Sequence, residues 1–246
     1  MLTKYPTIQM VTSSSIIYPK NDQVRARRVI FISNNGHPCK FGSLKCGRIL
    51  HLESGVERDW ATILEFDPTV IIFYEQPFRI EYFDAENKKR SIFPDFLVYY
   101  DNGSVVVVEI KLAADASEPE NKQKFELEKQ ILEYHGYGFK LITDEDMEND
   151  LLLSNSKKLR PYRRTSVDIV LRKQVLGELQ KMEMSEQEML GRVYGLTHEH
   201  ILSMLSQSLI ATDLSLPLTQ ESLFFRPKRQ SKLLQQQLLA FERVCV

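Results

Sequence analysis

The chain has few cysteines, with only three among its 246 residues. Three cysteines cannot build the dense disulfide framework of a small secreted domain. No apolar run approaches the roughly 18 residues of a membrane-spanning helix, and the first ten residues lack the continuous apolar segment of a signal peptide. We therefore expect a protein without a membrane span that acts in the reducing cytoplasm.

Phosphate-binding loops of the nucleotide-binding families are also missing from the sequence. Neither Gly-x-Gly-x-x-Gly nor a Walker-type loop occurs, so we do not expect the chain itself to use ATP. Hydrophobic residues make up 43% and charged residues 26% of the chain, which is ordinary for a globular protein and excludes a disordered or fibrous one.

The net charge of -1 conceals an asymmetry between the two halves. Residues 1–154 hold 18 Lys and Arg against 24 Asp and Glu, whereas residues 155–246 hold 14 against 9. This difference predicts two modules, of which the basic one either faces a polyanion or simply has a solvated basic surface.

The first half alternates between helical and strand periodicity. Residues 1–24 are rich in turn formers and read as an arm, and Val29–Ile32 reads as a short strand. The remaining pattern predicts a mixed α/β domain over residues 25–154, with helices flanking the sheet. Its expected helices are 53–66, 119–134 and 144–153, and its expected strands are 70–74, 78–83, 92–100, 105–111 and 139–143.

The second half begins with a polar stretch, 155–165, that reads as a basic linker. Its arginines, at 160, 163 and 164, either contact DNA phosphates or are solvated. Helices are expected at 167–182, 185–194 and 197–209, followed by a hairpin of 209–212 with 223–225. That order predicts an α-rich, winged-helix-like module over 166–226, with a helical tail over 227–246.

The chemistry-bearing residues lie on the expected hairpin of 92–100 with 105–111. Thirteen residues separate Asp95 from Glu109, and the Asp101–Gly103 turn lies between them. Antiparallel pairing brings the two carboxylates to the same end of the ladder, and Lys111 shares a face with Glu109. Two such oxygen ligands suit Mg²⁺ or Mn²⁺, and a lysine beside them can stabilise charge on a reacting phosphate. The structural alternative is a salt-bridged strand end.

A third acid, Glu57, lies near the start of the first expected helix. It joins the two carboxylates, forms a capping box with Ser54, or pairs with Arg58 or Lys111. Glu53 competes for the same role, while Gln76 either hydrogen-bonds the scissile strand or merely ends a strand. A zinc site from His37, Cys39, Cys46 and His51 is a weaker alternative, because its first ligand gap is short.

Four segments together resemble the TnsA endonucleases of heteromeric transposons. They are Glu57-Arg58-Asp59, Tyr74-Glu75-Gln76-Pro77, the segment from Phe93 to Val98, and Val108-Glu109-Ile110-Lys111. The spacing of nineteen residues from Glu57 to Gln76 fits that family, as does the two-module layout. The resemblance covers roughly residues 25–225.

This resemblance implies a restriction-endonuclease-like domain followed by a winged-helix-like domain. It implies Mg²⁺- or Mn²⁺-dependent hydrolysis of DNA at the 5′ ends of a transposon, with a TnsB-like transposase acting at the 3′ ends. It also implies contact between the C-terminal region and a TnsC-like AAA+ ATPase. Glu57, Asp95 and Glu109 would be acidic metal-site residues and Lys111 the catalytic lysine. Some family members carry glutamine where this chain has Glu109, which leaves the number of bound metals open.

Two other functions remain compatible with the sequence. The chain could be a catalytically idle adaptor that links a transposase to its ATPase regulator. It could also be a standalone restriction or repair nuclease of the same fold, which would cut DNA without a transposase.

Overall fold

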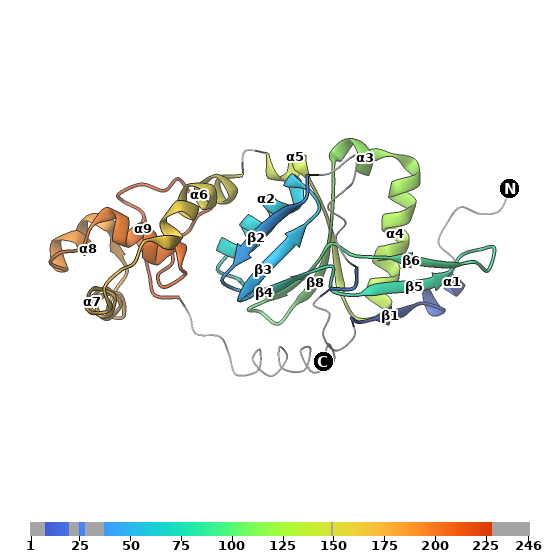
Figure 1. Ribbon diagram of the computed structural model, residues 1–246, viewed down its shortest axis with the longest axis horizontal. Helices are drawn as coiled ribbons and strands as arrows, with labels where there is room; N and C mark the ends of the chain where they lie inside the picture. The colour runs from blue at the N-terminus through green and yellow to red at the C-terminus, as the bar shows by residue number, and fades with distance from the viewer. Residues whose placement is uncertain (1–7, 20–24, 28–36, 149, 228–246) are drawn as a thin grey trace. The chain divides into compact units, whose positions relative to one another are not determined.

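A computed structural model describes residues 8–19, 25–27, 37–148 and 150–227 (Figure 1). The chain divides into two compact units. The first contains the described residues of 1–59 and of 69–148; the second contains Trp60–Pro68 and the described residues of 149–229. Helices and strands are mixed in the first unit, as predicted. None of the helices in the described ranges has the length and apolar composition needed to cross a bilayer.

The first unit is built on a four-stranded sheet with the order β4-β7-β8-β9. β4 (Val70–Glu75), β7 (Phe96–Tyr100) and β8 (Val105–Lys111) are antiparallel neighbours, and β9 (Gly138–Thr143) runs parallel to β8. The β7–β8 hairpin turns at Gly103, whose φ of 87° suits a residue without a side chain. This hairpin was predicted correctly.

A helical crossover joins the parallel strands β8 and β9, as such a connection requires. It comprises α3 (Ala113–Ser117) and α4 (Pro119–Tyr134). α4 begins with Pro119 at a position where a missing N–H costs nothing. Its Leu127, Ile131 and Leu132 form one core cluster with Leu97 and Val107 of the sheet.

A second sheet, of order β1-β5-β6, extends the first unit. β5 (Arg79–Phe83) pairs with β6 (Lys89–Ile92) and with β1 (Ser15–Ile17), which follows α1 (Ile8–Thr12). The N-terminal segment therefore supplies a helix and an edge strand, which its turn-rich composition did not predict. The single strand expected over 92–100 is wrong, because the chain leaves β6 at Ile92 and enters β7 at Phe96. The strand expected at Val29–Ile32 lies outside the described residues.

A two-stranded hairpin, β2 (Cys39–Ser43) with β3 (Arg48–Leu52), leads directly into α2 (Gly55–Phe66). Phe41, Leu50 and Leu52 are its fully buried side chains. α2 was predicted from its helical periodicity. Its first turn belongs to the first unit and its remainder, from Trp60, to the second.

The predicted basic linker, 155–165, is wrong. α5 (Asp144–Met147) is followed by α6 (Leu151–Leu159) and by the 3₁₀ helix η1 (Arg160–Arg164). Asn155 and Ser156 are buried, and the Asn155 amide donates hydrogen bonds to the carbonyl groups of Leu214 and Leu216. The polar composition predicted a linker, but both side chains are buried in the second unit, and the Asn155 amide is hydrogen-bonded there.

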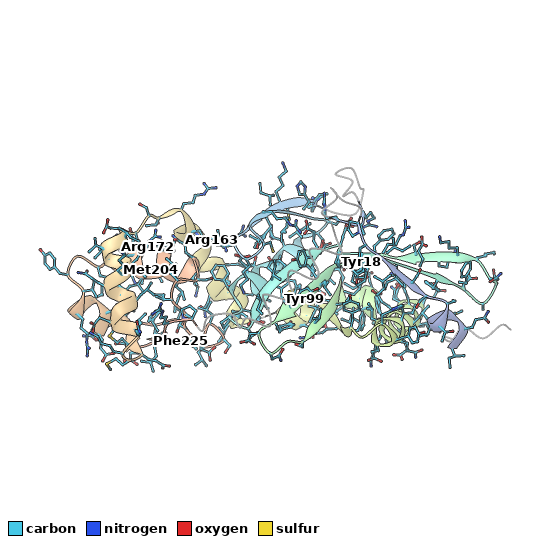
Figure 2. All side chains as sticks on the ribbon, turned by 90° about the horizontal axis from the view of Figure 1, so that it is seen from below. Tyr18, Tyr99, Arg163, Arg172, Met204 and Phe225 are labelled. Carbon is cyan, nitrogen blue, oxygen red and sulfur yellow. The ribbon has the colours of Figure 1, made fainter. Side chains whose placement is uncertain are left out.

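The second unit contains α7 (Ile169–Leu179), α8 (Glu186–Arg192) and α9 (His198–Ser206), and Figure 2 shows Met204 among its side chains. The predicted N-caps are confirmed: the Ser185 hydroxyl accepts from the Glu188 N–H and the Thr197 hydroxyl from the His200 N–H. The predicted pairing of 209–212 with 223–225 is confirmed in part. Only a single bridge joins Ala211 to Phe225, and β11 (Leu223–Phe224) pairs with β10 (Met184–Ser185) instead. The expected tail, 227–246, lies outside the described residues apart from its first residue.

Candidate active site

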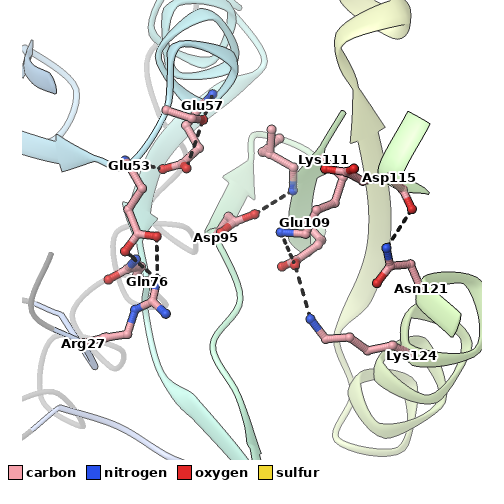
Figure 3. A network of polar contacts seen from close by, with 12 residues as sticks. Arg27, Glu53, Glu57, Gln76, Asp95, Glu109, Lys111, Asp115, Asn121 and Lys124 are labelled. Atoms are coloured by element: carbon pink, nitrogen blue, oxygen red, sulfur yellow. Dashed lines mark hydrogen bonds and ion pairs between the residues drawn. The ribbon is translucent and has the colours of Figure 1, made fainter. Parts of the chain in front are cut away.

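The two carboxylates of the β7–β8 hairpin meet at one end of the sheet, as predicted. Phe96 pairs with Val108, so Asp95 is the next residue outward opposite Glu109. Oδ2 of Asp95 accepts a 2.7 Å hydrogen bond from the Ile110 N–H (Figure 3). This bond ties the carboxylate to the neighbouring strand beyond the last ladder pair, and fixes where its side chain points.

Lys111 lies on the same face of β8 as Glu109, again as predicted. Its Nζ is 3.1 Å from Oε1 of Glu109, and Nζ of Lys124, from α4, is 4.0 Å from the same oxygen. Glu109 is only 2% exposed, whereas a third of the Lys111 side chain is reached by solvent. The lysine therefore neutralises a buried carboxylate while its ammonium stays accessible.

The electrostatics of this cluster favour added positive charge. Burial raises the pKa of Asp95 well above its ordinary value, and the neighbouring Glu109 raises it further, against an opposing effect of Lys111. Burial alone would lower the pKa of Lys111, but Glu109 and Asp95 outweigh it and the net pKa is raised. The lysine is thus held protonated. The acidic groups of the cluster still outnumber the ammonium groups beside them.

Glu57 caps α2. Its Oε1 accepts from the Ser54 hydroxyl at 3.1 Å and its Oε2 from the Glu53 N–H at 2.9 Å, while its own N–H donates to Ser54 Oγ. The Ser54 half of the predicted capping box is therefore present, while the Glu57 carboxylate accepts from the Glu53 N–H and the Ser54 hydroxyl. Burial raises the pKa of Glu57, and Lys111 lowers it, so the carboxylate also senses the cluster on β8. The structure brings Asp95, Glu109 and Lys111 together and places Glu57 across from them, directed at its own helix start (Figure 3).

A buried acid of α4, Glu128, was missed from the sequence. It is fully buried, and neither carboxylate oxygen has a hydrogen-bond partner within the described residues. Burial raises the pKa of Glu128 well above its ordinary value, and Glu109 and Asp95 add to the rise. The signal was present, because Glu128 interrupts the inward stripe of Phe125 and Ile131 at a spacing of three residues.

Some of the acidic residues of this cluster are suited to bind a divalent cation. Glu109 Oε2 is buried and without a partner in the described part of the chain, and hard carboxylate oxygens are what Mg²⁺ and Mn²⁺ prefer. In the described ranges, however, no group of three or more His, Cys, Asp or Glu side chains is arranged to hold a metal. The three expected acids, Glu57, Asp95 and Glu109, therefore do not surround a single metal position. Asp95 and Glu109 are the residues that would hold the ion, with solvent completing its coordination.

The zinc site and the phosphate contact of Arg163, the other candidate sites, are not supported by the contacts of their residues. The Cys39 thiol lies 3.9 Å from the Ser54 carbonyl and the Cys46 thiol 3.0 Å from that of Phe73, so the cysteines of the zinc alternative contact different parts of the backbone. Among the arginines proposed for phosphate contact, Arg163 is paired with the buried Glu65 and lies over the Phe66 ring. Figure 2 labels it within the second unit.

A comparison with protein families gives a match over the strands and the helix that carry most of the site. Residues 67–144 match the model described as TnsA-like endonuclease N terminal. This segment holds Gln76, Asp95, Glu109, Lys111 and Glu128, whereas Glu57 precedes it. A comparison with curated proteins finds no match. The resemblance to TnsA endonucleases is thus confirmed over these residues.

Proposed function

We propose that the chain is the metal-dependent DNA endonuclease subunit of a transposase, cutting at the 5′ ends of the transposon while a TnsB-like partner acts at the 3′ ends. One observation carries the proposal: Asp95, Glu109 and Lys111 converge at one strand end inside the segment that matches the TnsA-like model. Asp95 and Glu109 hold Mg²⁺ or Mn²⁺, which when bound supplies Lewis-acid activation of the phosphodiester.

The protein's own side chains have separate electrostatic roles beside the metal. Lys111, protonated and partly exposed, stabilises negative charge that develops on the phosphate during in-line attack by water. Glu57, at the start of α2, and Glu128, on α4, are further acidic groups of this cluster. The carboxylates exceed the ammonium groups in this cluster, which favours a divalent cation over further protein cations.

The second unit is proposed as a winged-helix-like module that binds a TnsC-like AAA+ regulator. Ile201–Ser206 are buried without interruption, so α9 has no exposed face beyond its first turn. A helix that reads a DNA groove must expose side chains along one face. This burial argues against DNA-groove binding by α9 and favours a protein partner for the second unit.

Cleavage of labelled transposon ends by the full chain with its cognate transposase tests the proposal. Asp95→Asn should lower 5′-strand cutting at least about 100-fold while 3′-strand cutting persists. Asp101→Asn, in the exposed turn of the same hairpin, is the matched control and should cut normally. If wild type makes no 5′ cut, the chain is the idle adaptor; if it cuts without the transposase, it is a standalone nuclease.

A further inference from the structure

Gln76 adopts a backbone conformation that few residues with a side chain accept. Its φ is 45°, in the left-handed region, and it directly precedes Pro77. Left-handed backbone is unfavourable for residues other than glycine, asparagine and aspartate, and a following proline restricts the choice further. Such strained positions gather at functional sites, where the surrounding structure holds them. Gln76 is also only 3% exposed, so its side chain is not placed for solvation.

Hydrogen bonds explain what this conformation achieves. The Gln76 N–H donates to the Asp95 carbonyl at 2.8 Å, one step beyond the last pair of the β4–β7 ladder. Its carbonyl accepts from the Ala26 N–H at 2.9 Å. The side-chain Nε2 donates to Oε1 of Glu53 at 2.9 Å (Figure 3). A carboxylate can only accept, so Glu53 fixes which way the amide faces.

Glu53 links Gln76 to the start of α2 through hydrogen bonds. Its N–H donates to Oε2 of Glu57, and its carboxylate is held by Arg27. A continuous path of hydrogen bonds therefore runs from the Asp95 main chain through Gln76 and Glu53 to the Glu57 carboxylate. No other partner holds the Gln76 amide in the described ranges, because its Oε1 is buried and unbonded.

We propose that Gln76 is a positioning residue of the nuclease site, setting the separation between Asp95 at the strand end and Glu57 at the helix start. This inference rests on the proposed function. Gln76 itself contacts neither metal nor DNA in this scheme. The left-handed backbone turns the chain at this residue. The main chain of Gln76 can then bond to Asp95 at the strand end, while its side chain bonds to Glu53 before the start of α2.

Gln76→Gly separates the two contributions. Glycine accepts the left-handed backbone and keeps both main-chain hydrogen bonds, but it removes the amide. We expect an unchanged melting temperature and an unchanged KM for DNA, with kcat lowered about 10- to 100-fold, as is typical when a supporting partner of a metal site is lost. Calorimetric titration with Mn²⁺ alone should show an affinity lowered by a similar factor. The matched control is Asn87→Gly, which makes the same change at a φ of 56° in the turn after β5 and should alter neither quantity.

An exchange of partners tests the hydrogen bond itself. Glu53→Gln combined with Gln76→Glu restores one donor and one acceptor with their direction reversed, and should recover most of the kcat that each single change removes. Wild-type kcat and Mn²⁺ affinity in Gln76→Gly would overturn the inference, as would a double variant no better than the singles. If wild type itself does not cut DNA, the proposed function fails, and the Mn²⁺ titration alone still decides whether Gln76 positions the acids.

Discussion

The ammonium of Lys111 lies 3.1 Å from one oxygen of Glu109, while the other oxygen of Glu109 is buried without a hydrogen-bond partner in the described residues. Both nearby ammonium groups, of Lys111 and Lys124, therefore lie at the same oxygen of the carboxylate. A salt-bridged strand end, the structural alternative, would satisfy both oxygens, because leaving a buried charged atom unpaired is costly. The unsatisfied oxygen favours a cation site over a purely structural pair.

Lys111→Met tests the role of the ammonium. We expect single-turnover 5′ cutting to fall about 100- to 1000-fold, because a preorganised charge at the reacting phosphate is lost. DNA affinity should change little, since one phosphate contact contributes only modestly to a salt-dependent interface. Lys122→Met, on the exposed side of α4, is the control. Equal cutting by the two variants would remove Lys111 from the mechanism.

Glu128→Gln should stabilise the protein in the absence of metal. The folded pKa of Glu128 lies well above its ordinary value of 4.5, so the folded chain binds more protons than the unfolded chain between those two pH values, and stability falls as pH rises through that window. Glutamine removes this penalty, with an expected gain of about 1–2 kcal/mol near neutral pH. The gain should vanish below pH 4.5, where the carboxyl is neutral in both states.

Urea unfolding at several pH values measures this difference, with Glu126→Gln on the exposed face of the same helix as control. A gain that is independent of pH would show that the carboxyl is not the cause. Saturating Mn²⁺ should reduce or reverse the advantage of Glu128→Gln, because the cation binds more tightly beside the additional carboxylate of the wild type and so stabilises the folded wild type more than the variant.

Glu57 has two roles that mutation can separate. Ser54→Ala removes the hydroxyl that caps α2 and should cost about 1 kcal/mol of stability, with little effect on cutting. Glu57→Gln keeps oxygen and nitrogen atoms at the cap but removes the charge, so it should preserve stability and lower cutting about 100-fold. Thermal unfolding and strand cleavage give the two measurements. If Glu57→Gln only destabilises and still cuts, the acid is a cap and nothing more.

Local rules predicted the placement of the charged residues of the β7–β8 hairpin well. The period of two along a strand and the turn at Gly103 suffice to put Asp95, Glu109 and Lys111 at one place. The cap of α2 by Ser54 followed from spacing alone. Each of these relationships joins residues close together in the chain, so neighbouring residues determine it.

Long-range relationships were missed. Glu128 belongs to the site because the parallel pairing of β8 and β9 packs α4 under Glu109, and that depends on the whole sheet. Asn155 and Ser156 were read as linker residues because composition does not show that Leu214 and Leu216 accept the Asn155 amide. Polar residues favour loops on average, but a buried polar group with partners is equally at home in a core.

Two adjacent arginines of η1 should behave differently. Arg163 pairs with Glu65, which is 1% exposed, and its Nε lies 3.3 Å from the Ser206 carbonyl. Arg163→Met would remove the guanidinium that is paired with the buried Glu65 carboxylate, so we expect a loss of about 3 kcal/mol in urea unfolding. Arg164 is exposed, and Arg164→Met should change stability by less than about 0.5 kcal/mol. If the basic surface of the second unit touches DNA, Arg164→Met should instead flatten the dependence of log affinity on log salt by about one unit. Similar stabilities for the two variants would contradict the assignment of Arg163 to the core.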